Sequence, residues 1–124
     1  MSGKTILYAE DNEFNRKIVR QALSRTTYRL IEAEDGEAAV TMAGEALPDL
    51  ILMDVQLPKL SGLEATRRLR ADPRTAAIPV IIVTSFALGG DEQRAIEAGA
   101  TAYLAKPYSP RQLVALIQKL APET

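Results

Sequence analysis

Acidic side chains that could hold a metal ion or accept a phosphoryl group occur at two places in the chain. Glu10 and Asp11 directly follow the apolar run Thr5–Ala9, and Asp54 follows a second apolar run, Asp49–Met53. Carboxylates about 4 Å apart repel by roughly 4 kcal/mol near a protein surface, so a cluster of them either takes up a proton or recruits a cation. If the three side chains meet, the result is an all-oxygen site that suits Mg²⁺.

A hydroxyl and an amine occupy equivalent positions further along the chain. Thr84 follows the apolar run Pro79–Val83, and Lys106 follows Ala102–Leu104. A divalent ion and an ammonium group can bind the oxygens of a phosphoryl group, and a hydroxyl can donate to another of them. A carboxylate with a free oxygen can then attack phosphorus and form an acyl phosphate. Because the chain contains no His, any phosphohistidine donor must be another protein.

Each of these residues also has an ordinary structural interpretation. A single Asp at a strand end is more often a helix cap than a nucleophile, and Thr is common in turns. Lys106 alone is more often a solvated surface amine, and Tyr103 alone is a half-buried packing residue. The functional interpretation is favoured because suitable groups follow four different apolar runs.

The elements that must position these groups are short apolar runs alternating with helical patterns. The third and fourth runs are continuously apolar, which is typical of strands buried on both faces of a parallel sheet. The alternation predicts a three-layer, doubly wound α/β fold with five parallel strands, in the order 2-1-3-4-5 or 3-2-1-4-5. In the first order, strands one and three are neighbours and the acidic groups converge. The expected strands are Thr5–Ala9, Tyr28–Ala33, Asp49–Met53, Pro79–Val83 and Ala102–Leu104.

Helix-start signals separate these runs. Ser61 with Glu64, and Ser109 with Gln112, predict capping boxes at the third and fifth helices, and Asp91 is expected to cap the fourth. The residues expected on the inner faces of the first two helices are Phe14, Ile18, Ala22 and Leu23, followed by Ala39, Met42, Ala43 and Ala46.

Composition excludes several classes of protein. The 124 residues include 15 basic and 16 acidic side chains, for a net charge of −1, so nothing favours binding to nucleic acid or an anionic membrane. The lack of Cys and His excludes disulfides, thiolate nucleophiles and histidine metal ligands. No apolar stretch is long enough for a signal peptide or a membrane span. We expect a cytoplasmic protein with one domain over residues 1–124.

The order and spacing of these segments resemble the receiver domain of two-component response regulators, over essentially the whole chain. Within that family, the Glu-Asp-Asn-x-x-Asn opening looks most like single-domain, cell-division regulators of the DivK type and the receivers of hybrid histidine kinases. The resemblance implies the 2-1-3-4-5 strand order, which is known for receivers. The matching segments are Ile6–Asn12, Leu52–Pro58, Ser61–Gly62, Val83–Ser85, Gly99–Ala100 and Tyr103–Pro107.

The resemblance implies a role for each candidate site residue. Asp54 corresponds to the phosphoryl acceptor. The Mg²⁺ ligands correspond to Glu10, Asp11, Asp54 and the main-chain carbonyl of Gln56, with Mn²⁺ as a possible substitute. The groups that contact the phosphoryl group and signal its presence correspond to Thr84 and Lys106, with Tyr103 at the aromatic switch position. The bond between Lys106 and Pro107 is often cis in this family.

The expected function is therefore a phosphorelay switch with no output domain and no separate substrate. A sensor histidine kinase or a histidine phosphotransfer protein donates to Asp54, and a downstream protein contacts the fourth helix, fifth strand and fifth helix. One alternative is a receiver excised from a hybrid histidine kinase. A flavodoxin-like FMN carrier lacks support, since Glu10–Glu13 replaces a phosphate loop and there is no Trp. A phosphatase with an aspartyl nucleophile usually needs a second Asp where this chain has Gln56.

Overall fold

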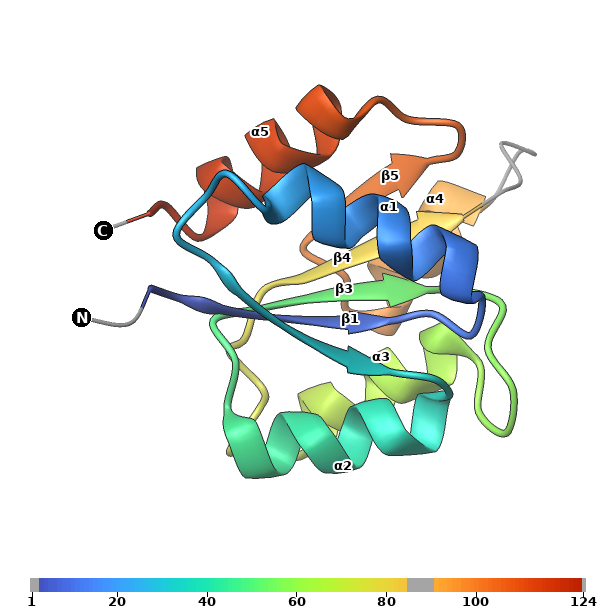
Figure 1. Cartoon of the computed structure of the whole chain (residues 1–124). Coiled ribbons are helices and arrows are strands. Elements are labelled where there is room, and N and C mark those ends of the chain that lie inside the picture. Colours follow the sequence, from blue (N-terminus) through green and yellow to red (C-terminus); the bar gives the residue numbers. More distant parts are fainter. Residues whose placement is uncertain (1–2, 85–90, 124) are drawn as a thin grey trace.

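A computed structural model describes residues 3–84 and 91–123. Within these ranges, five strands alternate with five helices, and the strands lie in one parallel sheet of order β2-β1-β3-β4-β5 (Figure 1). The predicted α/β fold and the first of the two strand orders are thereby confirmed. The elements are β1 Thr5–Ala9, α1 Glu13–Leu23, β2 Arg29–Ala33, α2 Gly36–Ala46, β3 Leu50–Asp54, α3 Gly62–Ala71, β4 Val80–Thr84, α4 Asp91–Ala98, β5 Ala102–Ala105 and α5 Pro110–Leu120.

Helices cover both faces of the sheet. Helices α1 and α5 pack on one face, and α2, α3 and α4 pack on the other (Figure 1). Strands β3 and β4 are buried along their whole length, as their continuous apolar sequences predict. Alternate residues divide between two apolar clusters: Tyr8 and Leu52 face α1 and α5, whereas Leu7 and Met53 face the other layer.

The capping signals give two different results. At α5, Ser109 Oγ accepts from Gln112 N at 3.1 Å and Gln112 Oε1 accepts from Ser109 N at 2.8 Å, so the predicted capping box is complete. At α3 only half of it forms. Ser61 Oγ accepts from Glu64 N at 3.2 Å, but the Glu64 carboxylate pairs instead with the arginines of the next turn, at positions 67 and 68.

The inner faces of α1 and α2 are confirmed in part: Leu23, Ala39 and Ala43 are buried as expected, and Ala22 and Met42 pack against the apolar clusters. Phe14 is 69% exposed, and the buried residues of α1 are Arg16, Val19 and Leu23. Ala46 is likewise exposed at the end of α2. Helix α1 is rotated because Arg16 occupies an inner position, where its guanidinium finds polar partners. The Asp91 side chain, Ser85 and residues 86–90 lie outside the described residues.

The two ends of the described chain meet at Thr27. The Glu123 carboxylate accepts from Thr27 N at 2.6 Å and from its hydroxyl at 2.9 Å. Gly3 packs so closely that a Cβ there would lie 1.9 Å from the Thr27 carbonyl oxygen. Both ends lie at the edge of the sheet opposite the strand arrowheads (Figure 1). No helix in the described ranges is long and apolar enough to cross a membrane.

Candidate functional site

The carboxyl ends of three strands bring three charged side chains into direct contact. Lys106, which follows β5, places its Nζ 2.8 Å from Asp54 Oδ2 and 3.3 Å from Glu10 Oε1. Asp54 ends β3 and Glu10 follows β1, and these strands are neighbours in the sheet. The predicted convergence of these three groups is confirmed.

Main-chain hydrogen bonds hold the site residues in place. Lys106 N donates to the Thr84 carbonyl at 2.7 Å, which extends the pairing of β5 with β4 to the lysine itself. Gln56 N donates to Asp54 Oδ1 at 3.1 Å, while Oδ2 receives the Lys106 ammonium. The Asp54 carboxylate is thus oriented by one main-chain donor and one cation.

Helix α3 begins directly behind Asp54. Gly62, its first residue, donates its N–H to Val55 O at 2.9 Å. A Cβ on Gly62 would lie 1.9 Å from the Asp54 carbonyl oxygen, so only glycine allows this approach without moving the backbone. The Ser61–Gly62 segment therefore belongs to the wall of the site.

Burial makes the charges of this cluster difficult to accommodate. The side chains of Glu10 and Asp54 are 3% and 7% exposed, and Lys106 is 21% exposed. Burial, with the neighbouring Asp54, raises the pKa of Glu10 above its usual value. Burial alone would lower the pKa of Lys106, but its contacts with Asp54 and Glu10 outweigh burial and raise it. Two carboxylates and one ammonium leave a net charge of −1, which favours a further cation.

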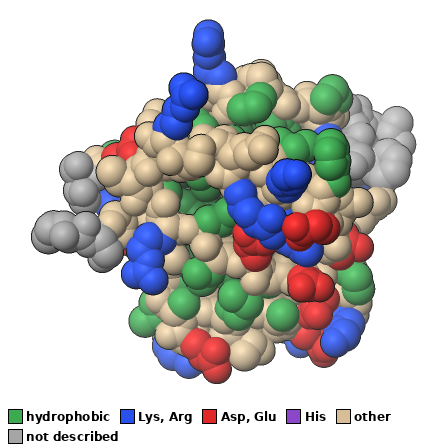
Figure 2. Space-filling view, viewed as in Figure 1, with side chains coloured by type: hydrophobic (Ala, Val, Ile, Leu, Met, Phe, Trp, Pro, Cys, Tyr) green, Lys and Arg blue, Asp and Glu red, His purple; other side chains and the backbone are tan. Residues whose placement is uncertain are grey.

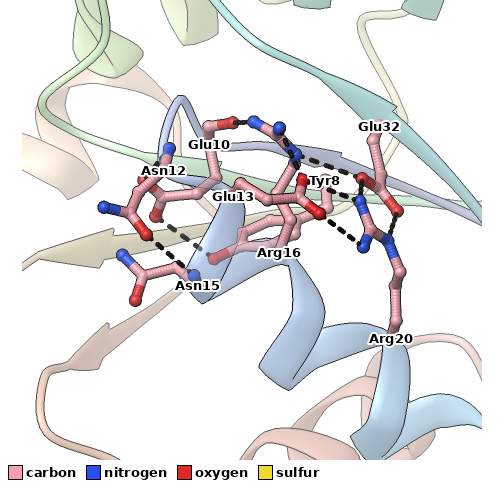
Figure 3. A network of polar contacts seen from close by, with 8 residues as sticks. All are labelled: Tyr8, Glu10, Asn12, Glu13, Asn15, Arg16, Arg20 and Glu32. Carbon is pink, nitrogen blue, oxygen red and sulfur yellow. Dashed lines mark hydrogen bonds and ion pairs between the residues drawn. The ribbon is translucent and has the colours of Figure 1, made fainter.

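Two residues that sequence reasoning missed hold Glu10 from opposite sides (Figure 3). The Tyr8 hydroxyl donates to Glu10 Oε1 at 3.2 Å, and Arg16 Nη1 donates to the Glu10 carbonyl at 2.8 Å. Asn12 N completes the set by donating to Oε2 at 3.2 Å. A signal was available in the sequence, because a tyrosine inside an aliphatic strand needs a hydrogen-bond partner.

Asp11 and Gln56 lie at the surface of this edge. The side chains of both are exposed, and the described residues contain no group of three acidic side chains arranged to hold a metal ion. The structure thus brings together two of the three predicted carboxylates. The donor set nevertheless fits Mg²⁺, since the buried pair Glu10 and Asp54 supplies oxygen ligands with excess negative charge, and Asp11 adjoins it in sequence.

Thr84 lies on β4, next to the strand that carries Asp54, and Tyr103 lies on β5, one strand further away. Thr84 ends β4 and is 3% exposed. Tyr103 pairs in register with Ile82 and is half-buried against the apolar cluster on the α2–α4 face. The Lys106–Pro107 peptide bond is cis, as the resemblance implied.

The site is open to solvent beside Lys106. A pocket of about 420 Å³ reaches the lysine between α1 and the segment that precedes α5. Its lining residues are Asn15, Ile18, Lys106, Pro107 and Tyr108. The Lys106 residue is therefore accessible to solvent from the α1 side.

Residues 6–118 match the family model of the response regulator receiver domain. The chain belongs to this family. It is also 44% identical, over 115 residues, to the polar-differentiation response regulator DivK of Brucella anthropi, an alignment that covers 93% of this chain and 94% of that protein. The DivK protein of Brucella ovis gives the same identity and coverage. The chain is thus a response-regulator receiver close to DivK-type regulators.

Solved structures of receivers superpose closely on this one. The receiver domain of a Pseudomonas aeruginosa sensor histidine kinase, with a magnesium ion in its active-site cleft, has a TM-score of 0.89 and 38% identity, covering 96% of this chain and 98% of that one. A chemotaxis response regulator of Vibrio cholerae has a TM-score of 0.88 and 27% identity, covering 94% and 98%. Receivers of this kind are typically switches rather than enzymes with separate substrates.

Proposed function

We propose that this receiver accepts a phosphoryl group on Asp54 from a phosphohistidine of a partner protein. The observation that carries the proposal is the contact of Lys106 Nζ with both Asp54 and Glu10, at 2.8 and 3.3 Å, at the carboxyl edge of the sheet. An ammonium group in this position can neutralise a phosphoryl group that arrives at Asp54.

The transfer exchanges one bond to phosphorus for another. An Asp54 oxygen forms the new O–P bond as the N–P bond of the donor breaks, and the released imidazole nitrogen keeps the electron pair and takes a proton from solvent. Lys106 then pairs with the phosphoryl oxygens in place of the free carboxylate, and Thr84 donates its hydroxyl to another oxygen. Hydrolysis of the acyl phosphate at this same residue resets the switch.

Mg²⁺ completes the site in this proposal. Glu10, Asp11, Asp54 and the main-chain carbonyl of Gln56 would hold the ion, with Mn²⁺ able to replace it. When bound, the ion neutralises charge on the transferred group. The magnesium ion in the Pseudomonas aeruginosa receiver supports this assignment, as does the negative charge of the buried pair.

The effect of phosphorylation is transmitted from Asp54 through the neighbouring strands to the surface of the protein. Phosphorylation adds negative charge and acceptor oxygens at Asp54. Thr84 and Tyr103 respond because they lie on the adjoining β4 and β5, and the surface of α4, β5 and α5 then contacts a downstream protein. The donor is a sensor histidine kinase or a histidine phosphotransfer protein, and the receiver works in the cytoplasm. The likeness to DivK supports a role in cell division or polar differentiation.

Replacement of the acceptor tests the proposal. The wild-type protein, incubated with acetyl phosphate and Mg²⁺, should gain one phosphoryl group that hydroxylamine removes, and peptide mass mapping should place it on Asp54. Asp54→Asn should lose the label and keep its circular dichroism spectrum, whereas Asp49→Asn, at the opposite end of β3, should label normally. Undiminished labelling of Asp54→Asn would refute the acceptor assignment.

Removal of the exposed carboxylate tests the metal assignment. Asp11→Ala should weaken Mg²⁺ binding about tenfold, because losing one charged ligand costs at least as much as losing an outer-shell partner. Calorimetric titration with Mg²⁺ measures the effect, and Asp35→Ala, which changes the cap of α2, is the control. An unchanged affinity in Asp11→Ala would remove this residue from the ligand set.

A further inference from the structure

Tyr8 is the one aromatic residue in β1, and it reaches the candidate site from inside the core. We propose that Tyr8 is a positioning residue, whose hydroxyl fixes the Glu10 carboxylate in the orientation in which it helps to hold Mg²⁺. This inference rests on the proposed function.

The contacts of the Glu10 carboxylate define that orientation. Oε1 accepts from the Tyr8 hydroxyl at 3.2 Å and from Lys106 Nζ at 3.3 Å, and Oε2 accepts from Asn12 N at 3.2 Å. Tyr8 approaches from β1, and Asn12 lies in the loop that follows this strand (Figure 3). Tyr8 and Lys106 thus hold Oε1, and the loop amide holds Oε2.

The Tyr8 hydroxyl matters because Lys106 alone does not determine where Glu10 lies. The lysine is closer to Asp54, at 2.8 Å, and Asp54 repels Glu10 electrostatically. Without the tyrosine hydroxyl, the donors that remain to the Glu10 carboxylate in the described structure are this shared ammonium and the loop amide. The carboxylate would then be free to follow either of them.

The position of Tyr8 separates this role from simple packing. Its ring is 0% exposed and lies in the apolar cluster with Leu50 and Leu52, so a phenylalanine would fill the same space. Its hydroxyl is the only part of the side chain that the role requires. An outer-shell hydrogen bond to a ligating carboxylate typically contributes 10–100-fold to metal affinity.

The chain offers a matched control in Tyr28. This tyrosine is also buried, at 7% exposure, and belongs to the same apolar cluster. Its hydroxyl donates to the Ala121 carbonyl at 2.6 Å, away from the charged cluster. Tyr28→Phe therefore removes a buried hydroxyl without touching Glu10.

The first experiment is a calorimetric titration of the full chain with Mg²⁺ alone. We expect Tyr8→Phe to raise the Kd for Mg²⁺ about tenfold and Tyr28→Phe to leave it unchanged. With acetyl phosphate, Tyr8→Phe should label Asp54 slowly at low Mg²⁺ and at the wild-type rate once Mg²⁺ saturates. An unchanged Kd in Tyr8→Phe, equal shifts in both variants, or a lower rate at saturating Mg²⁺ would each overturn the role.

A double variant protects the test against a general loss of stability. If Tyr8 acts through Glu10, adding Tyr8→Phe to Glu10→Ala, which removes every oxygen of that side chain, should produce no further change in the Kd for Mg²⁺. A further loss of affinity in the double variant would show that Tyr8 acts otherwise and would overturn the inference. Labelling of wild-type Asp54 by acetyl phosphate tests the proposed function separately. It does not depend on the Mg²⁺ affinity measured for Tyr8→Phe.

Discussion

The molecule contains two clusters of charged side chains within a few residues of one another, and they differ in charge balance and burial. Glu10 and Asp54 are buried, Lys106 is half-buried, and together the three side chains carry a net charge of −1. The second cluster pairs two glutamates with two arginines, and its members are Glu13, Arg16, Arg20 and Glu32 (Figure 3). Figure 2 shows basic and acidic side chains intermingled over α1 and the end of β2.

One glutamate in each cluster has a shifted pKa, and the two shifts have opposite directions. Burial raises the pKa of Glu10, whereas hydrogen bonds from Arg20 and Arg16 lower the pKa of Glu13 to about 2. In the balanced, open cluster, the acidic and basic side chains neutralise one another and their ion pairs stabilise the structure. An unbalanced, buried cluster is stabilised when a further cation or a reactant binds and offsets its excess charge. Both clusters consist of acidic and basic side chains. Burial and charge balance therefore determine which cluster stabilises the fold and which one can bind a ligand.

The largest effect should come from Arg16, which joins the two clusters. Arg16→Met keeps the aliphatic stem but removes the hydrogen bond to the Glu10 carbonyl, at 2.8 Å, and should lower the free energy of unfolding by about 2 kcal/mol. Arg20→Met, whose side chain is 41% exposed, should lower it less. Urea denaturation measures both variants, and equal losses would contradict the distinction between buried and open contacts.

Removal of a site charge should stabilise the fold. Because the pKa of Glu10 is raised, the native state holds this proton more tightly than the unfolded state, and stability falls as pH rises above the usual value of 4.5. Glu10→Gln should abolish this decline and increase the free energy of unfolding at neutral pH, measured by urea denaturation in a chelator.

The exposed Glu64 provides the control for that measurement. Glu64→Gln, on the surface of α3, should not raise stability at neutral pH. If Glu10→Gln proved less stable than wild type at neutral pH and equally stable in acid, the ionised Glu10 would contribute to stability. The contrast between the two clusters would then be lost.

The smallest effect concerns Glu13. Its lowered pKa means that its contribution to stability is fully present above the usual value of 4.5 and disappears as the pH falls towards 2. Glu13→Gln should therefore have a lower free energy of unfolding than wild type at neutral pH, and the difference between the two should shrink through this acid range. A carboxyl NMR titration of Glu13 in the wild-type protein checks the cause, and a midpoint near 4.5 would contradict it.

The strand ends were predictable because the apolar runs place their following residues at one edge of a parallel sheet. This reasoning located Glu10, Asp54 and Lys106. It could not give the direction of individual side chains, so Asp11, next to Glu10, was expected in the same cluster but is exposed. The assignment of Asp11 as a metal ligand therefore stays a prediction.

The rotation of α1 was mispredicted for a related reason. Helical spacing identifies sets of residues that share a face, but two sets compete here. The expected set contains Phe14, Ile18, Ala22 and Leu23, whereas the buried set contains Arg16, Val19 and Leu23, so the two sets share Leu23. Apolar pattern alone favours the first set, whereas the polar partners of Arg16 select the second. Tyr8 was missed because its contact with Glu10 depends on the length of its side chain.

The meeting of Gly3 and Glu123 at Thr27 has a practical consequence for engineering. Since the first and last described residues share a neighbour, a short linker could join them, and the chain could be reopened elsewhere as a circular permutant. New ends in the turn between α2 and β3 would lie before the start of β3, at the other end of that strand from Asp54 and its charged contacts.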